Sequence, residues 1–196
     1  MHDKKTVLVT GIGVITSIGC TRTEFWNSLI SGKSGIGRIS AFDPEGHLSQ
    51  IASEVTGFDP ESYITFKQAR KMARVSQFAS CAAIEAVKDA GLDLDSEDRA
   101  RIACVIGSAA GDYDTIQQQH LRYHEKGPGS VNPQSIPRII PNMPACNAAI
   151  TLGIHGPNLG VATACATGAS AIGVALGLLR QGQADVVLSG GAESTI

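Results

Sequence analysis

Apolar residues occur along the chain in two patterns, and the two patterns alternate. Short continuous apolar runs, typical of buried strands, predict strands over residues 6–10, 101–107, 159–163 and 185–189. Longer segments with apolar residues at helical spacing predict helices over residues 67–90, 112–125, 143–154 and 166–181. Strands that alternate with helices indicate a layered α/β fold around a largely parallel sheet.

One more helix is expected near the amino terminus. Thr21 and Glu24 have the spacing of a capping box, and residues 25–30 place apolar side chains on one helical face. Residues 33–66 carry turn signals without a clear period. The proline-rich stretch 127–141 is expected to be a loop with a functional or interface role.

The composition is that of a globular protein. The 196 residues are 43% hydrophobic and 17% charged, and the formal net charge is −2. A sizeable core is therefore possible, and no strong field favours nucleic acid. The sequence shows no signal-peptide or transmembrane run, so we expect a cytoplasmic protein without a membrane segment. We interpret residues 1–196 as one domain.

The cysteines and histidines do not form a metal-binding or disulfide pattern. The five cysteines are scattered and include no CxxC pair, which favours a reducing compartment: Cys20, Cys81, Cys104, Cys146 and Cys165. His120 and His124 lie one helical turn apart, but no third ligand follows nearby. We therefore predict no metal site.

Small residues surround Cys165 almost without interruption between residues 161 and 173. A strand followed at once by a helix places this cysteine beside unpaired backbone N–H groups, which stabilise an anion. A thiolate is the nucleophilic form of cysteine. Ala164 and Gly168 would let a bulky thioester approach closely. The competing interpretation is a buried structural cysteine, a common environment for this residue.

The segment from Gly156 to Gly173 resembles the nucleophile motif of the β-ketoacyl-acyl-carrier-protein synthases, the condensing enzymes of fatty-acid and polyketide synthesis. Further stretches resemble elongating members of that family, namely Val7–Gly19, Phe25–Ile36 and Asp185–Ser194. The resemblance implies a thiolase-like fold, of which residues 1–196 would be the N-terminal βαβαβ half of a pseudo-duplicated pair. Family members are longer. Their second half supplies two catalytic histidines, a lysine and a gating phenylalanine, and no position here corresponds to these.

The resemblance also implies a reaction. Cys165 would take an acyl group from acyl carrier protein, and a decarboxylative Claisen condensation with malonyl-carrier-protein would follow. Neither a metal nor an organic cofactor would be required. The full-length enzyme would be a homodimer, and residues outside this chain would complete the condensation chemistry.

Three small side chains would shape the acyl pocket by the same resemblance. Ala110 and Ser135 occupy positions where relatives often carry larger side chains, and Ala164 adjoins the nucleophile. Smaller residues at these positions predict a longer or differently shaped pocket.

A basic cluster at the start of the long helix would dock the acidic carrier protein. Lys67, Arg70 and Lys71 match basic residues that have this role in the family. Electrostatic steering of an acidic partner is physically reasonable. The competing interpretation is an ordinary solvated helix face.

Two other classes of function remain as alternatives. Gly11 and Gly13 after an apolar run are similar to the start of a dinucleotide-binding motif, but the remaining glycine and the acidic residue are not in register. A half-length chain could also be a non-catalytic fragment or a dimer-partner subunit like a chain-length factor. Chain-length factors usually lack the nucleophile cysteine, whereas Cys165 is present.

Overall fold

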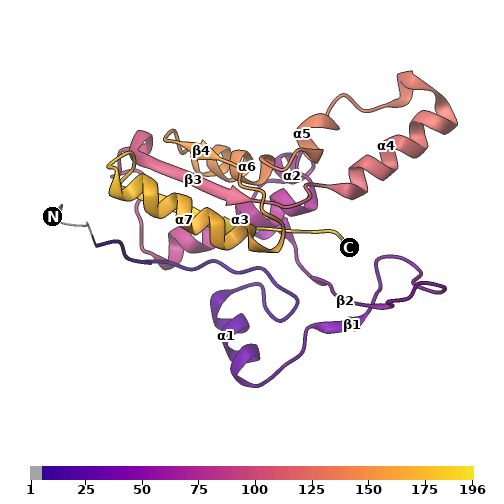
Figure 1. The fold of residues 1–196 in the computed structure, drawn as a ribbon, viewed down its shortest axis with the longest axis horizontal. Coiled ribbons are helices and arrows are strands. Elements are labelled where there is room, and N and C mark those ends of the chain that lie inside the picture. Colours follow the sequence, from indigo (N-terminus) through magenta and orange to yellow (C-terminus); the bar gives the residue numbers. More distant parts are fainter. Residues whose placement is uncertain (1–5) are drawn as a thin grey trace.

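The sheet at the centre of the structure contains three parallel strands in the order β4-β3-β5 (Figure 1). The structure is a computed structural model and describes residues 6–196. Strand β3 spans Ile102–Gly107, β4 spans Asn158–Leu159 and β5 spans Val186–Gly191. The predicted α/β fold with a parallel sheet is confirmed.

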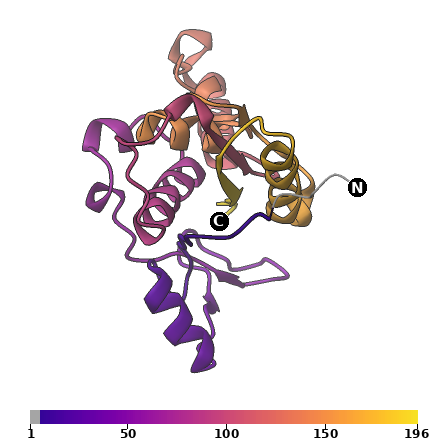
Figure 2. The same cartoon turned by 90° about the vertical axis from the view of Figure 1, so that its left-hand side faces the viewer.

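Strand β3 is buried on both faces, and its alternating side chains separate two hydrophobic clusters. Ile102, Cys104 and Ile106 pack with α3 (Arg74–Asp89) and α6 (Met143–Leu152). Ala103 and Val105 pack with α7 (Thr167–Arg180) on the other face. In Figure 2 the gold helix α7 and the magenta helix α3 lie on opposite sides of the strands. The result is a three-layer α/β/α arrangement.

The long helix expected over residues 67–90 is two helices in the structure. Helix α2 spans only Phe66–Ala69, and α3 begins at Arg74. Thr65 and Gln68 form a complete capping box at the start of α2. Burial of Met72 and Ala73 in the connecting turn favours the break over a continuous helix.

The predicted polar helix is present, whereas the predicted proline-rich loop contains short helical segments. Helix α4 spans Tyr113–Lys126 as expected, buries only Thr115 and reaches away from the sheet in Figure 1. The stretch expected to be a loop contains the short helix α5 at Ile136–Ile139 and a 3-10 turn at Pro128–Ser130.

The strand predicted over residues 6–10 is wrong. This segment has no ladder partner among residues 6–196, and Leu8 and Val9 are 74% and 85% exposed. The chain that follows packs its backbone on α3 instead. A Cβ on Gly13 would lie 1.8 Å from the Ala82 carbonyl oxygen, so only glycine permits this approach.

The remaining elements lie to one side of the layers (Figures 1 and 2). Helix α1 (Arg22–Ile30) begins at Thr21, whose hydroxyl accepts the Glu24 amide at 3.2 Å. It buries none of its residues, so its apolar face is left exposed. Strands β1 (Ile36–Arg38) and β2 (Ile51–Ser53) form an antiparallel hairpin that the sequence pattern did not predict.

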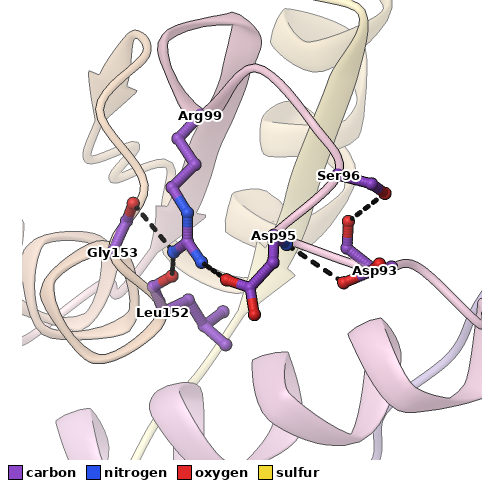
Figure 3. A network of polar contacts seen from close by, with 6 residues as sticks. All are labelled: Asp93, Asp95, Ser96, Arg99, Leu152 and Gly153. Atoms are coloured by element: carbon purple, nitrogen blue, oxygen red, sulfur yellow. Dashed lines mark hydrogen bonds and ion pairs between the residues drawn. The ribbon is translucent and has the colours of Figure 1, made fainter.

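An arginine connects the turn before β3 to the end of α6 (Figure 3). The Arg99 guanidinium donates to the carbonyl oxygens of Leu152 and Gly153 at 2.7 and 3.3 Å, and pairs with Asp95 at 2.7 Å. Leu152 is the last residue of α6 and Gly153 is its C-cap, so these carbonyls lack intrahelical partners. Further 3-10 turns occupy Pro60–Ser62 and Arg99–Arg101. Among residues 6–196, no helix is both long and apolar enough to cross a bilayer.

Candidate functional site

Cys165 lies in the turn that joins β4 to α7. It is the middle residue of a 3-10 turn, Ala164–Ala166, that runs directly into α7 at Thr167. All five cysteines lie in the described part of the chain, and Cys165 alone among them is exposed. The strand predicted over residues 159–163 is wrong beyond Leu159, because the pairing of β4 with β3 ends there and residues 160–163 are irregular. Cys165 still lies between a strand and a helix, as predicted, and its exposure does not fit the interpretation as a buried structural cysteine.

The Thr167 side chain fixes the backbone of this turn. Its hydroxyl accepts the Thr163 amide at 2.9 Å and donates to the Ala164 carbonyl at 2.7 Å. Ala164 has φ of 51°, the left-handed region that a non-glycine residue adopts at a cost of about 1 kcal/mol or more. The surrounding hydrogen bonds therefore maintain a sharp bend immediately before the cysteine.

The ends of β3 and β5 approach the start of α7 closely because the meeting residues are glycines. A Cβ on Gly107 would lie 2.2 Å from Thr167 Cγ2, and a Cβ on Gly191 would lie 3.1 Å from Gly168 Cα. The carboxyl ends of parallel strands are a common place for ligand sites in α/β folds. Here that edge of the sheet contains the turn with Cys165.

The other cysteines have a different chemical environment. Cys81 and Cys104 are completely buried, and desolvation raises the pKa of each thiol to about 12. Burial also raises the pKa of Cys146 and Cys20. These four thiols are therefore held in the protonated, weakly nucleophilic form at neutral pH.

The residues expected to shape an acyl pocket lie on segments that meet. Ala110 is half-buried in the loop after β3, and Ser135 is buried at the start of α5. The two segments touch where a Cβ on Gly111 would lie 2.1 Å from the Ile139 carbonyl oxygen. Ala164 is exposed beside Cys165. The loop that carries Ala110 leaves β3 at Gly107, the residue that contacts Thr167.

The three basic residues are brought together on α2 and the turn after it. Lys67, Arg70 and Lys71 are all exposed. The Arg70 guanidinium lies 5.5 Å from the centre of the exposed Phe66 ring. They form a small, solvent-accessible basic surface with one aromatic side chain.

The described residues contain no group of three or more side chains that could hold a metal ion. His120 and His124 are ring neighbours on α4, with centroids 4.5 Å apart.

Glu193 makes a contact at this edge of the sheet that the sequence pattern did not reveal. It follows β5, and its carboxylate accepts hydrogen bonds from Ser108 and Ala109 in the loop after β3. These partners lie more than eighty residues earlier in the chain, so no local spacing indicates the contact. Only the sheet register, which pairs Gly107 with Gly191, brings them together.

Comparisons with known proteins agree with this geometry. The family model described as "Beta-ketoacyl synthase, N-terminal domain" matches residues 4–196. The 3-oxoacyl-[acyl-carrier-protein] synthase 2 of Vibrio cholerae is 41% identical over 191 residues, which cover 97% of this chain and 46% of that protein. The enzyme of the same name from Staphylococcus aureus is 39% identical over 196 residues, which are 100% of this chain and 47% of that protein.

Solved structures show the same fold. A β-ketoacyl synthase from Burkholderia phymatum superposes with a TM-score of 0.84 at 28% identity, covering 96% of this chain and 47% of that one. The ishigamide ketosynthase/chain length factor superposes with a TM-score of 0.89 at 33% identity, covering 98% of this chain and 48% of that one.

The parallel βαβαβ unit with a cysteine at its strand-to-helix turn is the thiolase-like fold of the ketosynthases. The chain belongs to the β-ketoacyl synthase family and matches the N-terminal domain of that family. It spans about half the length of the curated relatives it matches.

Proposed function

We propose that the chain provides the acyl-accepting half of a 3-oxoacyl-acyl-carrier-protein synthase, with residues 1–196 as one N-terminal domain and Cys165 as the nucleophile. The Cys165 sulfur attacks the carbonyl carbon of an acyl thioester. The bond from that carbon to the carrier sulfur breaks, and the carrier thiol leaves with the proton from Cys165. The exposure of Cys165 at a turn fixed by Thr167 carries this proposal.

The condensation that follows consumes the acyl-enzyme. Malonyl-carrier-protein loses carbon dioxide, the resulting carbanion attacks the acyl carbonyl, and the Cys165 thiolate leaves. The products are a 3-oxoacyl-carrier-protein, carbon dioxide and the Cys165 thiolate, which takes up one proton from water to regenerate the thiol, so atoms and charge balance without a cofactor. We assign only the acyl transfer to residues of this chain, because the resemblance places the histidines that promote decarboxylation in the second half of family members.

The partners and the pocket belong to the same proposal. Lys67, Arg70 and Lys71 would contact the acidic carrier protein, and their common exposure supports this role. Ala110, Ser135 and Ala164 would line the acyl pocket. The complete enzyme would act in the cytoplasm as a homodimer.

The experiment is acyl transfer to the complete polypeptide that carries these residues. The protein is incubated with an acyl-carrier-protein, and its adducts are located by intact mass and peptide mapping. We expect one acyl group on Cys165 in the unmodified protein, none on Cys165→Ala and a normal adduct on the matched control Cys146→Ala.

The alternative of a non-catalytic fragment or a subunit like a chain-length factor predicts a different result. It gains some support from the likeness to the ishigamide ketosynthase/chain length factor. A protein that remains folded but takes no acyl group on Cys165 would favour that alternative and contradict our proposal.

A further inference from the structure

Glu193 connects the end of β5 to the loop that follows β3. Glu193 Oε1 accepts a hydrogen bond from the Ser108 hydroxyl at 2.9 Å, and Oε2 accepts one from the Ala109 amide at 2.9 Å. Both carboxylate oxygens are therefore used on two consecutive residues of one loop. A carboxylate acceptor makes these bonds stronger than neutral ones.

Ser108 extends this connection along the loop. Its side chain is completely buried, and its oxygen accepts the Gly111 amide at 3.0 Å while the hydroxyl donates to Glu193. The contact thus links Gly111 to Glu193 through Ser108. Gly111 has φ of +71° and packs on the carbonyl of Ile139 in α5.

Ala110 lies between these fixed points. The Glu193 carboxylate fixes the backbone on one side of it at Ala109, and the Ser108 oxygen fixes the other side at Gly111. The Ala110 side chain is a single methyl group and can form no hydrogen bond of its own. Its position relative to α5 and the Cys165 turn therefore depends on Glu193.

We propose that Glu193 is a positioning residue for acyl-chain selectivity: by fixing the loop Ser108–Gly111, it sets how far Ala110 lies from the Cys165 turn and hence which chain lengths fit. This inference rests on the proposed function, because it takes Cys165 as the acyl acceptor and Ala110 as part of the pocket wall. Glu193 itself does not contact the acyl chain. It acts through the backbone of the loop.

The test compares acyl transfer from short and long substrates in matched variants. The complete polypeptide receives hexanoyl or tetradecanoyl groups from carrier protein, and the rate at Cys165 is followed by mass. Glu193→Gln keeps the size of the side chain but replaces one acceptor oxygen with an amide donor. Ser108→Ala removes the relay to Gly111 and leaves the bond from Ala109. Glu54→Gln is the control, because Glu54 also accepts backbone amides, from Ser40 and Ala41, in a different loop.

We expect the ratio of the faster to the slower acylation rate to fall about fivefold in Glu193→Gln and in Ser108→Ala. The same ratio should stay unchanged in Glu54→Gln. Hydrogen exchange gives a readout that is independent of turnover. The amides of Ala109 and Gly111 should exchange about tenfold faster in Glu193→Gln.

The outcomes separate this inference from the proposed function. An unchanged rate ratio in folded Glu193→Gln, with normal acylation of Cys165, overturns the inference alone. Equal slowing of both substrates also overturns it, because a purely structural role would affect all chain lengths alike. Absence of acylation in the unmodified protein overturns the proposed function, and the inference falls with it.

Discussion

Gly107 at the end of β3 and Thr167 at the start of α7 are in direct contact, and the contact requires that residue 107 has no side chain. A Cβ on Gly107 would lie 2.2 Å from Thr167 Cγ2 and 2.2 Å from the Val161 carbonyl oxygen. The same Thr167 side chain uses its hydroxyl to fix the turn around Cys165. One residue thus couples the sheet edge to the candidate nucleophile.

We expect Gly107→Ala to disturb the Cys165 turn. The new methyl group must displace Thr167 or the backbone at Val161, with a cost of about 1–3 kcal/mol in unfolding free energy. A displaced nucleophile should slow acyl transfer to Cys165 by about tenfold to a hundredfold. Urea unfolding and the rate of adduct formation by mass measure both effects.

The matched control is Gly173→Ala on α7. A Cβ at Gly173 meets no atom within 4 Å, so the substitution should raise helix stability by up to about 1 kcal/mol. Acyl transfer should be unchanged. Equal loss of activity in both variants would show that the Gly107 contact has no special role.

The Thr167 hydroxyl can be tested separately from the Thr167 shape. Thr167→Val leaves the Thr163 amide and the Ala164 carbonyl without their partner, at a cost of about 1–3 kcal/mol. The left-handed Ala164 should relax, so acyl transfer to Cys165 should fall by at least about tenfold. Unfolding free energies and adduct rates are compared with those of the unmodified protein.

Thr151→Val provides the contrast for that experiment. The buried Thr151 hydroxyl has no hydrogen-bond partner within residues 6–196, so its removal should be neutral or stabilising. Acyl transfer at Cys165 should continue at its normal rate. If Thr167→Val behaved in the same way, the Thr167 hydroxyl would not fix the turn.

The central strand β3 and the helix after Cys165 could be predicted because their signals are local. The continuous apolar run at 101–107 predicts a strand, which the structure has as β3 at Ile102–Gly107. The small residues after Cys165 predict the helix that follows it. The strand predicted over 159–163 is present only at Leu159, because the chain leaves its pairing with β3 after that residue. Helix α7 begins at Thr167, one residue after the predicted start at 166.

The missed features depend on contacts between distant parts of the chain. Residues 6–10 have the apolar pattern of a strand, but a strand also requires a ladder partner, and residues 6–196 provide none. The break between α2 and α3 lacks a proline or glycine, and the Thr65–Gln68 capping box marks the start of α2 rather than its end. Glu193 could not be assigned before the register of β3 and β5 was known.

Because two thiols are buried, the unfolding free energy should decrease as the pH becomes alkaline. Burial raises the pKa of Cys81 and Cys104 from an ordinary 9.0 to about 12, so the folded state keeps these protons after the unfolded state releases them. Their contribution is therefore full below pH 9 and is lost as the pH rises toward 12. Each thiol should lower the unfolding free energy by about 1.4 kcal/mol per pH unit in that range.

Urea unfolding at several pH values above and below 9 measures this slope. Cys104→Ala should reduce this slope by the contribution of one thiol. The double variant with Cys81→Ala should reduce the slope further. A slope that does not change in either variant would mean that other groups determine the alkaline loss of stability.

Arg99 should stabilise the protein mainly through the carbonyls of α6. Its partner Asp95 has a side chain that is 91% exposed, so that ion pair contributes about 0–1 kcal/mol. The bonds to Leu152 and Gly153 satisfy carbonyls at a helix end, and a charged donor to such groups contributes about 1.5–3 kcal/mol. We expect Arg99→Met to lower the unfolding free energy by about 2 kcal/mol. Asp95→Asn should cost much less, and equal losses in the two variants would assign the effect to the ion pair.

The basic surface of Lys67, Arg70 and Lys71 should contribute to the binding of acyl-carrier-protein and not to the binding of the acyl group itself. We expect Lys67→Gln combined with Lys71→Gln to raise KM for an acyl-carrier-protein about fivefold at low salt, because two favourable charge contacts are lost. KM for a small acyl thioester without the carrier should not change. The difference should shrink as salt is added, because exposed charges are screened.

The control for this surface changes the same number of charges elsewhere. Lys88 and Arg180 are exposed near the carboxyl ends of α3 and α7, whereas Cys165 precedes the amino end of α7. Lys88→Gln combined with Arg180→Gln should leave KM for both substrates unchanged. An equal rise in KM for the carrier-linked substrate in both double variants would indicate a general charge effect. The α2 cluster would then be a solvated helix face with no role in docking.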